Sequence, residues 1–474
     1  MQGRRAWLTY VILGAGMLLR VALAATTPPD RAYDDHYEPL KIILEERRVP
    51  HASACWECYQ PPAYYVLSAA VYTVIRPLAG EEVDTEHLAR RCLQGVSVAA
   101  GCATLVVCLL IFRRMPALAA AELPAMALVA FLPRHLYMSA MATNDALTYF
   151  LASVAIYTAC CAHSARWPIG RSLLAGALAG AAVLSKGYGW VTVAAILLST
   201  WWFTRRTADT PPRSRLAREL PRPLLLVLAG ALVPAIWPTV RTAVAFNFER
   251  LHVDNFALFD NPLRFQPPGS IGETSFASFR FRALLDKPWL HRDHADSFWT
   301  QAYARLWFDY EGEKTTLAPY PPWQALWERS AREQPRWNRQ RWDMLLSYAP
   351  DEVPPRLRAV AVAAYLAGLP LTLVVVAGAG LAVRRMRQDF PLALLSIHAL
   401  LALLVPVVQT LRLPHFCAMK MAFALSGLAS AAVFLALVLV SVRRPAIRGV
   451  LYAAVAVALV VIALSDLGYL CLRS

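Results

Sequence analysis

The sequence lacks the patterns that mark several classes of soluble enzyme. It has no Walker phosphate loop and no G-x-G-x-x-G fingerprint, so no nucleotide-binding domain is expected. It shows no repeat of about 20–50 residues and no low-complexity tract. No cysteine or histidine spacing matches a zinc site. A cleavable signal peptide is absent as well, because Arg20 interrupts the apolar region before Ala24 and Ala25. We therefore expect the first hydrophobic segment to be an uncleaved anchor.

Charged residues are scarce and apolar residues are abundant. The 474 residues are 17% charged and 57% hydrophobic, with a mean hydropathy of +0.41, whereas soluble domains are about 45–50% apolar. Apolar runs of about 18–20 residues recur, enough to cross a hydrocarbon core about 30 Å thick. The sequence predicts an all-α polytopic membrane protein with about eleven spans, near residues 7–25, 92–112, 117–138, 146–163, 172–187, 188–203, 223–245, 358–382, 390–408, 419–441 and 449–468.

The distribution of positive charge predicts the topology. The net charge of +15 indicates basic cytoplasmic loops rather than nucleic-acid binding. Arg4 and Arg5 place the N-terminus in the cytoplasm, so the first loop, residues 26–91, lies outside. Segment 62–79 is apolar enough to cross, but a crossing there would put the later basic loops outside. We interpret it as a partly embedded outer helix, which makes these clusters cytoplasmic: Arg113 and Arg114, Arg166 and Arg171, the arginines of 205–222, Arg384, Arg385 and Arg387, and Arg443, Arg444 and Arg448.

A large external segment is expected at residues 246–357. It holds 14 Lys/Arg against 15 Asp/Glu, and it contains seven tryptophans. This aromatic content is too high for a disordered linker, so we expect a compact, mostly helical external region. The predicted organisation is a transmembrane module at 1–245, this external region at 246–357, and C-terminal transmembrane helices at 358–474.

Polar and charged residues gather at the expected outer ends of the spans. Ionised groups beside a bilayer are costly and tend to be functional. Carboxylates together with cations suit a reaction in which a carboxylate removes a proton as the base and cations hold a leaving phosphate. The residues concerned are Asp34, Asp35 and Glu57 in the first external loop, Asn144 and Asp145 at a span start, Lys186 and Arg241 at span ends, and Arg412, His415 and Lys420 after the ninth span.

Each of these residues also has a simpler structural interpretation. Asp34 and Asp35 could cap a helix expected at 37–46, and Asp145 could be an N-cap alone. Lys186 and Arg241 could be snorkelling residues at helix ends.

The histidine and the cysteines of the first loop also leave alternatives. His36 is expected to be an orienting hydrogen-bond partner rather than a metal ligand, because it directly follows the two aspartates. Cys55 and Cys58 have redox-motif spacing without the βαβ context of a thioredoxin-like fold. A disulfide and two free thiols both remain open.

Three motifs follow one another along the first half of the chain. They are Asp34-Asp35 followed by Gln60-Pro61-Pro62-Ala63-Tyr64-Tyr65, then Asn144-Asp145-Ala146-Leu147, then Leu184-Ser185-Lys186-Gly187. In this order they resemble the GT-C membrane glycosyltransferases, and more narrowly the protein mannosyltransferase and aminoarabinose transferase-like group (glycosyltransferase family 39 and its bacterial relatives). The resemblance covers residues 1–250, and the remainder matches in layout only.

The resemblance implies a GT-C-like bundle and a polyprenyl-phosphate-linked sugar as donor. It implies that Asp34 acts as the base on the acceptor, that Asp145 assists, and that Lys186 contacts the lipid phosphate. This chain departs from the family pattern by having Asp at position 35 rather than Glu, by His36, and by the insertion Cys55-Trp56-Glu57-Cys58.

The predicted activity is inverting transfer of a hexosyl or pentosyl group to a hydroxyl of a lipid, glycan or protein at the outer face of a membrane, taken to be a bacterial inner membrane. The predicted catalytic residues are Asp34, Asp35 and Asp145. A divalent metal is compatible with this chemistry, but nothing in the sequence requires a metal or other cofactor. The predicted substrate-binding residues are His36, Glu57, Gln60, Tyr64, Asn144, Lys186 and Arg241.

Two alternatives come from other functional classes. A transporter or flippase of lipid-linked sugars predicts charged groups at mid-membrane depth and symmetry between the halves, whereas the charges here lie at the expected outer ends. A non-catalytic envelope-polysaccharide assembly protein would tolerate loss of Asp34 and Asp35.

Overall fold

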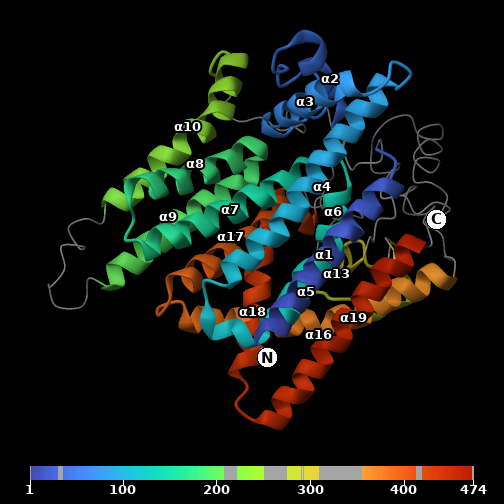
Figure 1. Ribbon diagram of the computed structural model, residues 1–474, viewed down its shortest axis with the longest axis vertical. Coiled ribbons are helices and arrows are strands. Elements are labelled where there is room, and N and C mark those ends of the chain that lie inside the picture. The colour runs from blue at the N-terminus through green and yellow to red at the C-terminus, as the bar shows by residue number, and fades with distance from the viewer. Residues whose placement is uncertain are drawn as a thin grey trace.

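The protein is a bundle of helices. The computed structural model describes residues 2–29, 36–207, 221–249, 275–289, 291, 293–308, 355–412 and 419–471. Within these ranges there is no β-strand, only a single bridge between Ser275 and Ser297. The helices run at varied tilts through an elongated molecule (Figure 1). The expected all-α fold is thereby confirmed.

Eight helical stretches of the described residues are long and apolar enough to cross a bilayer. They are α1 (Gln2–Thr26), α4 (Thr85–Phe112), α7 (Asn144–Ser164), α10 (Pro221–Ala245), α16 (Pro355–Arg385), α17 (Phe390–Arg412), η7 with α18 (Met421–Gly427 and Leu428–Ser441) and α19 (Pro445–Cys471). The remaining helices are shorter or bent: α2 (Tyr37–Glu46), α3 (Ala63–Ile75), η1 (Arg76–Leu78), η2 (Pro116–Ala121), α5 (Glu122–Phe131), α6 (Pro133–Ala140), α8 (Ile169–Ser185), η3 (Gly187–Gly189), α9 (Trp190–Thr207), α12 (Phe281–Asp286) and α13 (Phe298–Trp307).

The span expected at 117–138 is not one straight helix. η2 and α5 together are bent by 46° against α6. The bend lies at Leu132, whose extended backbone is the conformation favoured before a proline, here Pro133. Counting the bent pair as one span gives nine. α8 and α9 coincide with the two remaining expected spans and are about 26–27 Å long at 1.5 Å per residue. The count of eleven stays a prediction.

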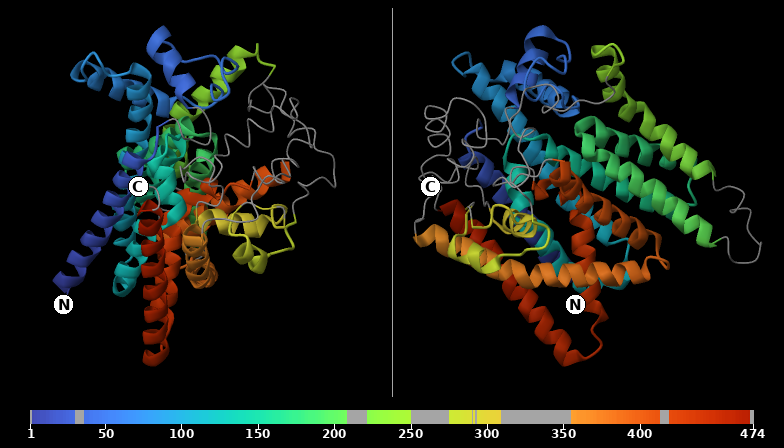
Figure 2. Two further views of the ribbon diagram at one scale, coloured as in Figure 1. Left: turned by 90° about the vertical axis from the view of Figure 1, so that its right-hand side faces the viewer. Right: turned by 180° about the vertical axis from the view of Figure 1, so that it is seen from behind.

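The segment at 62–79 forms α3, with 13 residues, and the directly following turn η1. α3 alone is about 20 Å long, against a hydrocarbon core of about 30 Å. α2 and α3 lie together at one end of the bundle, opposite the turn between α18 and α19 (Figures 1 and 2). The expectation that this segment does not span fits its length.

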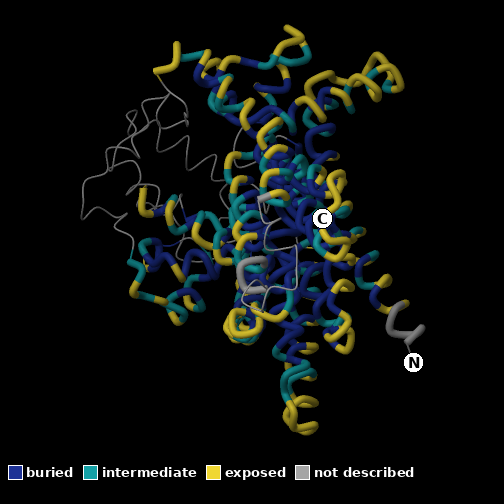
Figure 3. Tube along the Cα trace, turned by 90° about the vertical axis from the view of Figure 1, so that its left-hand side faces the viewer, coloured by how far each residue is buried: buried dark blue, intermediate teal, exposed yellow. Residues whose placement is uncertain are grey.

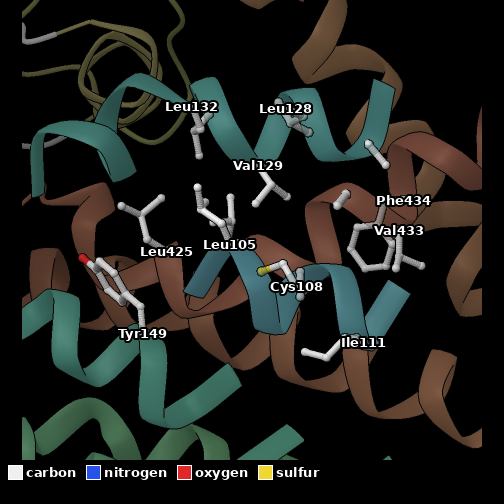
Figure 4. Close-up of a cluster of buried hydrophobic side chains, with 14 of the residues drawn as sticks. Leu105, Cys108, Ile111, Leu128, Val129, Leu132, Tyr149, Leu425, Val433 and Phe434 are labelled. Atoms are coloured by element: carbon white, nitrogen blue, oxygen red, sulfur yellow. The ribbon is translucent and has the colours of Figure 1, made fainter. Parts of the chain in front are cut away.

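One hydrophobic core joins both ends of the chain. Buried side chains are concentrated along the middle of the bundle (Figure 3), and one cluster extends from Leu13 to Tyr469. Figure 4 shows part of it, where Leu105 and Cys108 of α4 and Val129 of α5 lie with Phe434 of α18. The C-terminal helices therefore complete the core of the N-terminal ones.

The described part of the expected external region packs on the bundle. α13 lies beside α16 (Figure 2). The Trp307 indole donates to Thr372 at 2.8 Å, and its ring covers Gly368, where a Cβ would come within 2.5 Å of it. The expected helical cap otherwise falls largely on residues 250–274 and 309–354, outside the described residues.

Glycines allow α8 and α10 to touch backbone to backbone. A Cβ on Gly176 would lie 2.1 Å from the Val227 carbonyl oxygen, and one on Gly230 would lie 2.2 Å from the Leu173 carbonyl oxygen. Gly180 follows Gly176 by one helical turn and also faces α10. This small-residue spacing is the one that brings membrane helices into close contact.

Gly176→Ala should therefore destabilise the protein. The added methyl group has no space, and overpacking of this kind typically costs about 1–3 kcal/mol. The measurement is thermal unfolding in detergent, followed by helical circular dichroism. The matched control is Gly170→Ala on the same helix, where a Cβ meets nothing within 4 Å. Equal stability of the two variants would contradict the packing described here.

Candidate functional site

An ion pair joins the start of α7 to the end of α8. The Lys186 ammonium lies 2.7 Å from Asp145 Oδ2, and the Tyr188 hydroxyl donates to Oδ1 at 2.7 Å. The side chains of Lys186 and Asp145 are 13% and 6% exposed. The rings of Tyr188 and Phe423 lie 6.0 and 5.8 Å from the ammonium. The structure thus brings together two of the residues that the sequence singled out, Asp145 and Lys186.

Local backbone geometry explains why the two residues meet. Thr143, not Asp145, is the N-cap of α7, and its hydroxyl accepts from the Asp145 N–H and donates to Asp145 Oδ2 at 2.9 Å. Asp145 is therefore in the first helical turn, where the helix dipole favours a carboxylate. Lys186 ends α8 in an extended conformation. The interpretation of Asp145 as an N-cap alone is therefore wrong, and Lys186 forms an ion pair with it inside the bundle.

The two helix ends are also bonded directly. The Thr148 hydroxyl donates to the Asn144 carbonyl at 3.0 Å and lies 3.0 Å from the Ser185 hydroxyl. The Asn144 side-chain amide donates to the Ser185 carbonyl at 3.3 Å. Asn144 is fully buried, and the contact of its amide nitrogen is with α8. A substrate contact of Asn144 stays a prediction.

A second set of bonds links α3 and α4 to the same helix start. The Ser97 hydroxyl donates to the Thr143 carbonyl at 3.0 Å and accepts from the Thr143 N–H at 3.2 Å. The Tyr64 hydroxyl lies 3.0 Å from Ser97 Oγ and donates to the Leu93 carbonyl. Burial raises the pKa of the Tyr64 hydroxyl, so Tyr64 remains a donor. α3 thereby helps to fix the segment that carries Asp145.

The next residue of α3 contacts the first external loop. The Tyr65 hydroxyl lies 2.9 Å from His36 Nδ1, and His36 is buried. His36 is the N-cap of α2, makes no side-chain cap bond and contacts α3 through Tyr65, and its orienting role stays a prediction. Asp34 and Asp35 lie outside the described residues.

Arg241 ties the first external loop to α10. Its guanidinium donates to the carbonyls of Pro50 and Cys58 at 2.6 Å and of Gln60 at 3.1 Å. Cys55 and Cys58 form a disulfide within this loop, which decides the alternative left open by the sequence. These bonds hold the segment of the loop that leads into α3. The predicted role of Arg241 on a phosphate is not among them and stays a prediction.

The remaining predicted residues of this loop are buried within it. Glu57 is 1% exposed and Gln60 is 8% exposed. The Gln60 amide donates to the Tyr59 hydroxyl at 2.8 Å. Among the described residues, no group of three His, Cys, Asp or Glu side chains is placed to hold a metal.

Arg20 is fully buried in the core, and its partners differ from those of the Asp145–Lys186 pair. Its guanidinium donates to the carbonyls of Gly16 and Ala130 at 2.8 Å and lies 2.8 Å from His135 Nδ1. It joins α1 to α5 and α6. Its partners Ala130 and His135 lie on either side of the bend at Leu132, so Arg20 holds α6 at its angle to α5.

Sequence reasoning missed Tyr188, Thr143 and Ser97. Tyr188 reaches Asp145 because η3 folds back on α8, and Gly189 permits this since a Cβ there would lie 2.4 Å from the Ala182 backbone. The Gly187-Tyr188-Gly189 run beside Lys186 was the available signal. Ser97 carried no signal, because it sits within a long apolar helix.

Comparison with known proteins bears on the fold. The apo oligosaccharyltransferase of Archaeoglobus fulgidus superposes with a TM-score of 0.50 at 16% identity, covering 97% of this chain and 56% of that one. The chain has the GT-C fold. Because the match covers 56% of the archaeal enzyme, this chain spans little more than half of that enzyme's length. No family model and no curated protein matches the sequence.

Two further solved structures are similar to a lesser degree. AglB of the same archaeon, in complex with an inhibitory peptide and a dolichol-phosphate, gives a TM-score of 0.48 at 15% identity, over 96% of this chain and 55% of that one. ArnT from Cupriavidus metallidurans bound to undecaprenyl phosphate gives 0.37 at 16% identity, over 92% and 78%.

The Asp145–Lys186 pair should be strongly coupled in stability. Asp145→Asn leaves a buried ammonium without its carboxylate, and such single changes typically cost about 3–5 kcal/mol. Asp145→Asn with Lys186→Met removes both charges, so its loss should be well below the sum of the single losses. The free energy of unfolding in detergent measures this cycle. The control is Glu86→Gln in the Glu86–Arg90 pair, whose carboxylate is 51% exposed, where a loss of at most about 1 kcal/mol is expected. Additive losses at 145 and 186 would contradict the coupling.

Proposed function

We propose that the protein is an inverting membrane glycosyltransferase that uses a polyprenyl-phosphate-linked sugar. The GT-C fold alone does not select this activity, because a fold hosts many functions. The observation that carries the proposal is the Lys186 ammonium, 13% exposed and held at a helix end by a carboxylate. Such a site combines a fixed cation with an apolar surrounding.

The ammonium has the capacity to bind a phosphate without leaving Asp145. A lysine ammonium has three N–H donors, and one of them points to Asp145 Oδ2. In the proposal, the other two contact oxygens of a lipid phosphate, which the 13% exposure of the lysine side chain supports. Asp145 holds the ammonium in place, and the Tyr188 hydroxyl in turn holds Asp145. A prepositioned cation stabilises charge that develops during a reaction because it needs no reorganisation.

The proposed reaction is a single displacement. Asp34 or Asp35 takes the proton of an acceptor hydroxyl, and the acceptor oxygen attacks the anomeric carbon of the donor. The bond from that carbon to the phosphate oxygen breaks, and polyprenyl phosphate leaves with inversion. The negative charge that grows on the phosphate oxygen is stabilised by Lys186. The bonds of Tyr65 to His36 and of Tyr64 toward Thr143 support both acidic segments from one helix, α3.

The location, the acceptor and the substrate-binding residues in this proposal are taken from the sequence. The reaction is placed at the outer face of a bacterial inner membrane, with a lipid, glycan or protein hydroxyl as acceptor. His36, Glu57, Gln60, Tyr64, Asn144 and Arg241 are proposed to line or support the substrate path, and no cofactor is invoked.

Asp34→Asn with Asp35→Asn should abolish donor consumption, because no base then remains to take the acceptor proton. The measurement is mass-spectrometric or thin-layer detection of sugar released from radiolabelled polyprenyl-phosphate sugars by purified protein in lipid. Asp84→Asn in the same loop is the control. Asp84 caps α4, and asparagine caps equally well.

Two outcomes of this assay would overturn parts of the proposal, the first the identity of the base and the second the enzyme assignment. Donor consumption that continues in the Asp34/Asp35 variant would exclude these carboxylates as the base. Movement of intact lipid-linked sugar across the bilayer, without consumption by the unaltered protein, would favour the transporter instead.

Lys186→Gln should lower kcat by roughly 10²–10³-fold, the usual loss when one donor to a developing charge is removed. Tyr188→Phe removes a bond to Asp145 but leaves the cation in place, so its effect should be smaller. Rates at saturating donor separate kcat from binding. An unchanged kcat with only KM raised would show that Lys186 holds the ground-state donor and not the leaving phosphate.

A further inference from the structure

A groove of about 930 Å³ lies at the same end of the bundle as the first external loop, between α2, α3 and the start of α4. Leu44, Ala69 and Tyr72 supply apolar lining. Lys41, Arg47, Arg48 and Arg76 supply positive charge, against a single acidic lining residue, Glu45. The groove therefore combines an apolar floor with a cationic rim.

Two of the rim cations are not neutralised by carboxylates. Lys41 lies 4.0 Å from Glu45, and Arg48 lies 2.5 Å from Glu46. The ion pairs of the described residues include neither Arg47 nor Arg76, and Arg76 donates to the Gly80 carbonyl. Such arginines are well suited to phosphate oxygens, because the guanidinium is planar and always charged.

The length of α4 places the groove at the level of lipid headgroups. α4 has 28 residues, about 42 Å of helix, and exceeds a hydrocarbon core of about 30 Å by about 12 Å. Its charged residues, Glu86, Arg90 and Arg91, are at its N-terminal end, and none occurs from 92 to 112. The groove lining includes Thr85 and Ala89 of that charged end.

An exposed apolar strip continues from the groove along α3. Val66 and Val74 are 46% and 68% exposed, and Leu78 just beyond is 82% exposed. Val66 also lines the groove. A helix at the membrane interface places such side chains against acyl chains. Free phosphate would make no use of this surface, whereas a lipid would use both the rim and the strip.

We infer that this groove docks an anionic phospholipid, with its phosphate between Arg47 and Arg76 and an acyl chain over the apolar floor and the strip. The inference is independent of the proposed transferase activity. The competing explanation is that Arg47 and Arg76, which end α2 and α3, merely complement the helix dipoles.

The test is native mass spectrometry of the full chain released from detergent, titrated with dioleoylphosphatidylglycerol or dioleoylphosphatidylcholine. The unaltered protein should retain the anionic lipid preferentially. Arg47→Gln with Arg76→Gln should weaken its binding by about tenfold or more, since each basic residue near a membrane surface contributes substantially to anionic-lipid binding. Ala70→Trp, which fills the groove without changing charge, should also weaken it.

The controls separate docking from general surface attraction. Arg443→Gln with Arg444→Gln removes two exposed arginines at the opposite end of the bundle, and binding should be unchanged. The inference is overturned by equal retention of the two lipids, by an equal loss in this control pair, or by full binding in Ala70→Trp. Displacement of the lipid by inorganic phosphate alone would likewise overturn it in favour of a free-phosphate site. Unfolding temperatures verify that all variants remain folded.

Discussion

The ion pair of Asp145 and Lys186 is the interaction on which the arrangement of the site depends. Each charge is nearly excluded from solvent, and each would be costly to bury alone. Their pairing requires the N-terminus of α7 and the C-terminus of α8 to meet, so the polar side chains at both helix ends turn toward one another. The surrounding hydroxyl bonds, which extend through Ser97 to α3, satisfy groups that would otherwise be lost inside an apolar bundle.

The need of buried polar groups for partners also explains how the other helices of the bundle are joined. Arg20 of α1 reaches the Ala130 carbonyl near the end of α5 and His135 of α6, and the Tyr137 hydroxyl donates to Asp466 of α19 at 3.2 Å. These bonds cross between helices that are far apart in the sequence. Because apolar side chains distinguish poorly between lipid and protein neighbours, buried polar contacts and close glycine contacts give the helices defined partners. Gly378 against the Phe434 backbone does this for α16 and α18.

The loop between α1 and α4 joins the site to α10. Arg241 and the disulfide hold the chain that enters α3, and α3 then carries Tyr64 toward Thr143 and Tyr65 toward His36. One short helix thus contacts both segments that bear candidate acids. The same helix forms a wall of the groove with the cationic rim. Substitutions in α3 are therefore expected to affect both the candidate site and the groove.

The sequence by itself determined the all-helical membrane architecture, the end points of α2, and the short helix at 62–79, because apolar periodicity, chain length and loop charge are local properties. It also singled out Asp145 and Lys186, since charges at span ends stand out against apolar runs. The Thr143 cap and the bend before Pro133 are local features that sequence reasoning missed. Only the tertiary structure decided that Asp145 and Lys186 pair and that Arg241 holds a loop. Those outcomes depend on which helix ends lie side by side. That choice is made by contacts between residues distant in sequence, as between Asp145 and Lys186 or Arg20 and Ala130, which no local pattern encodes.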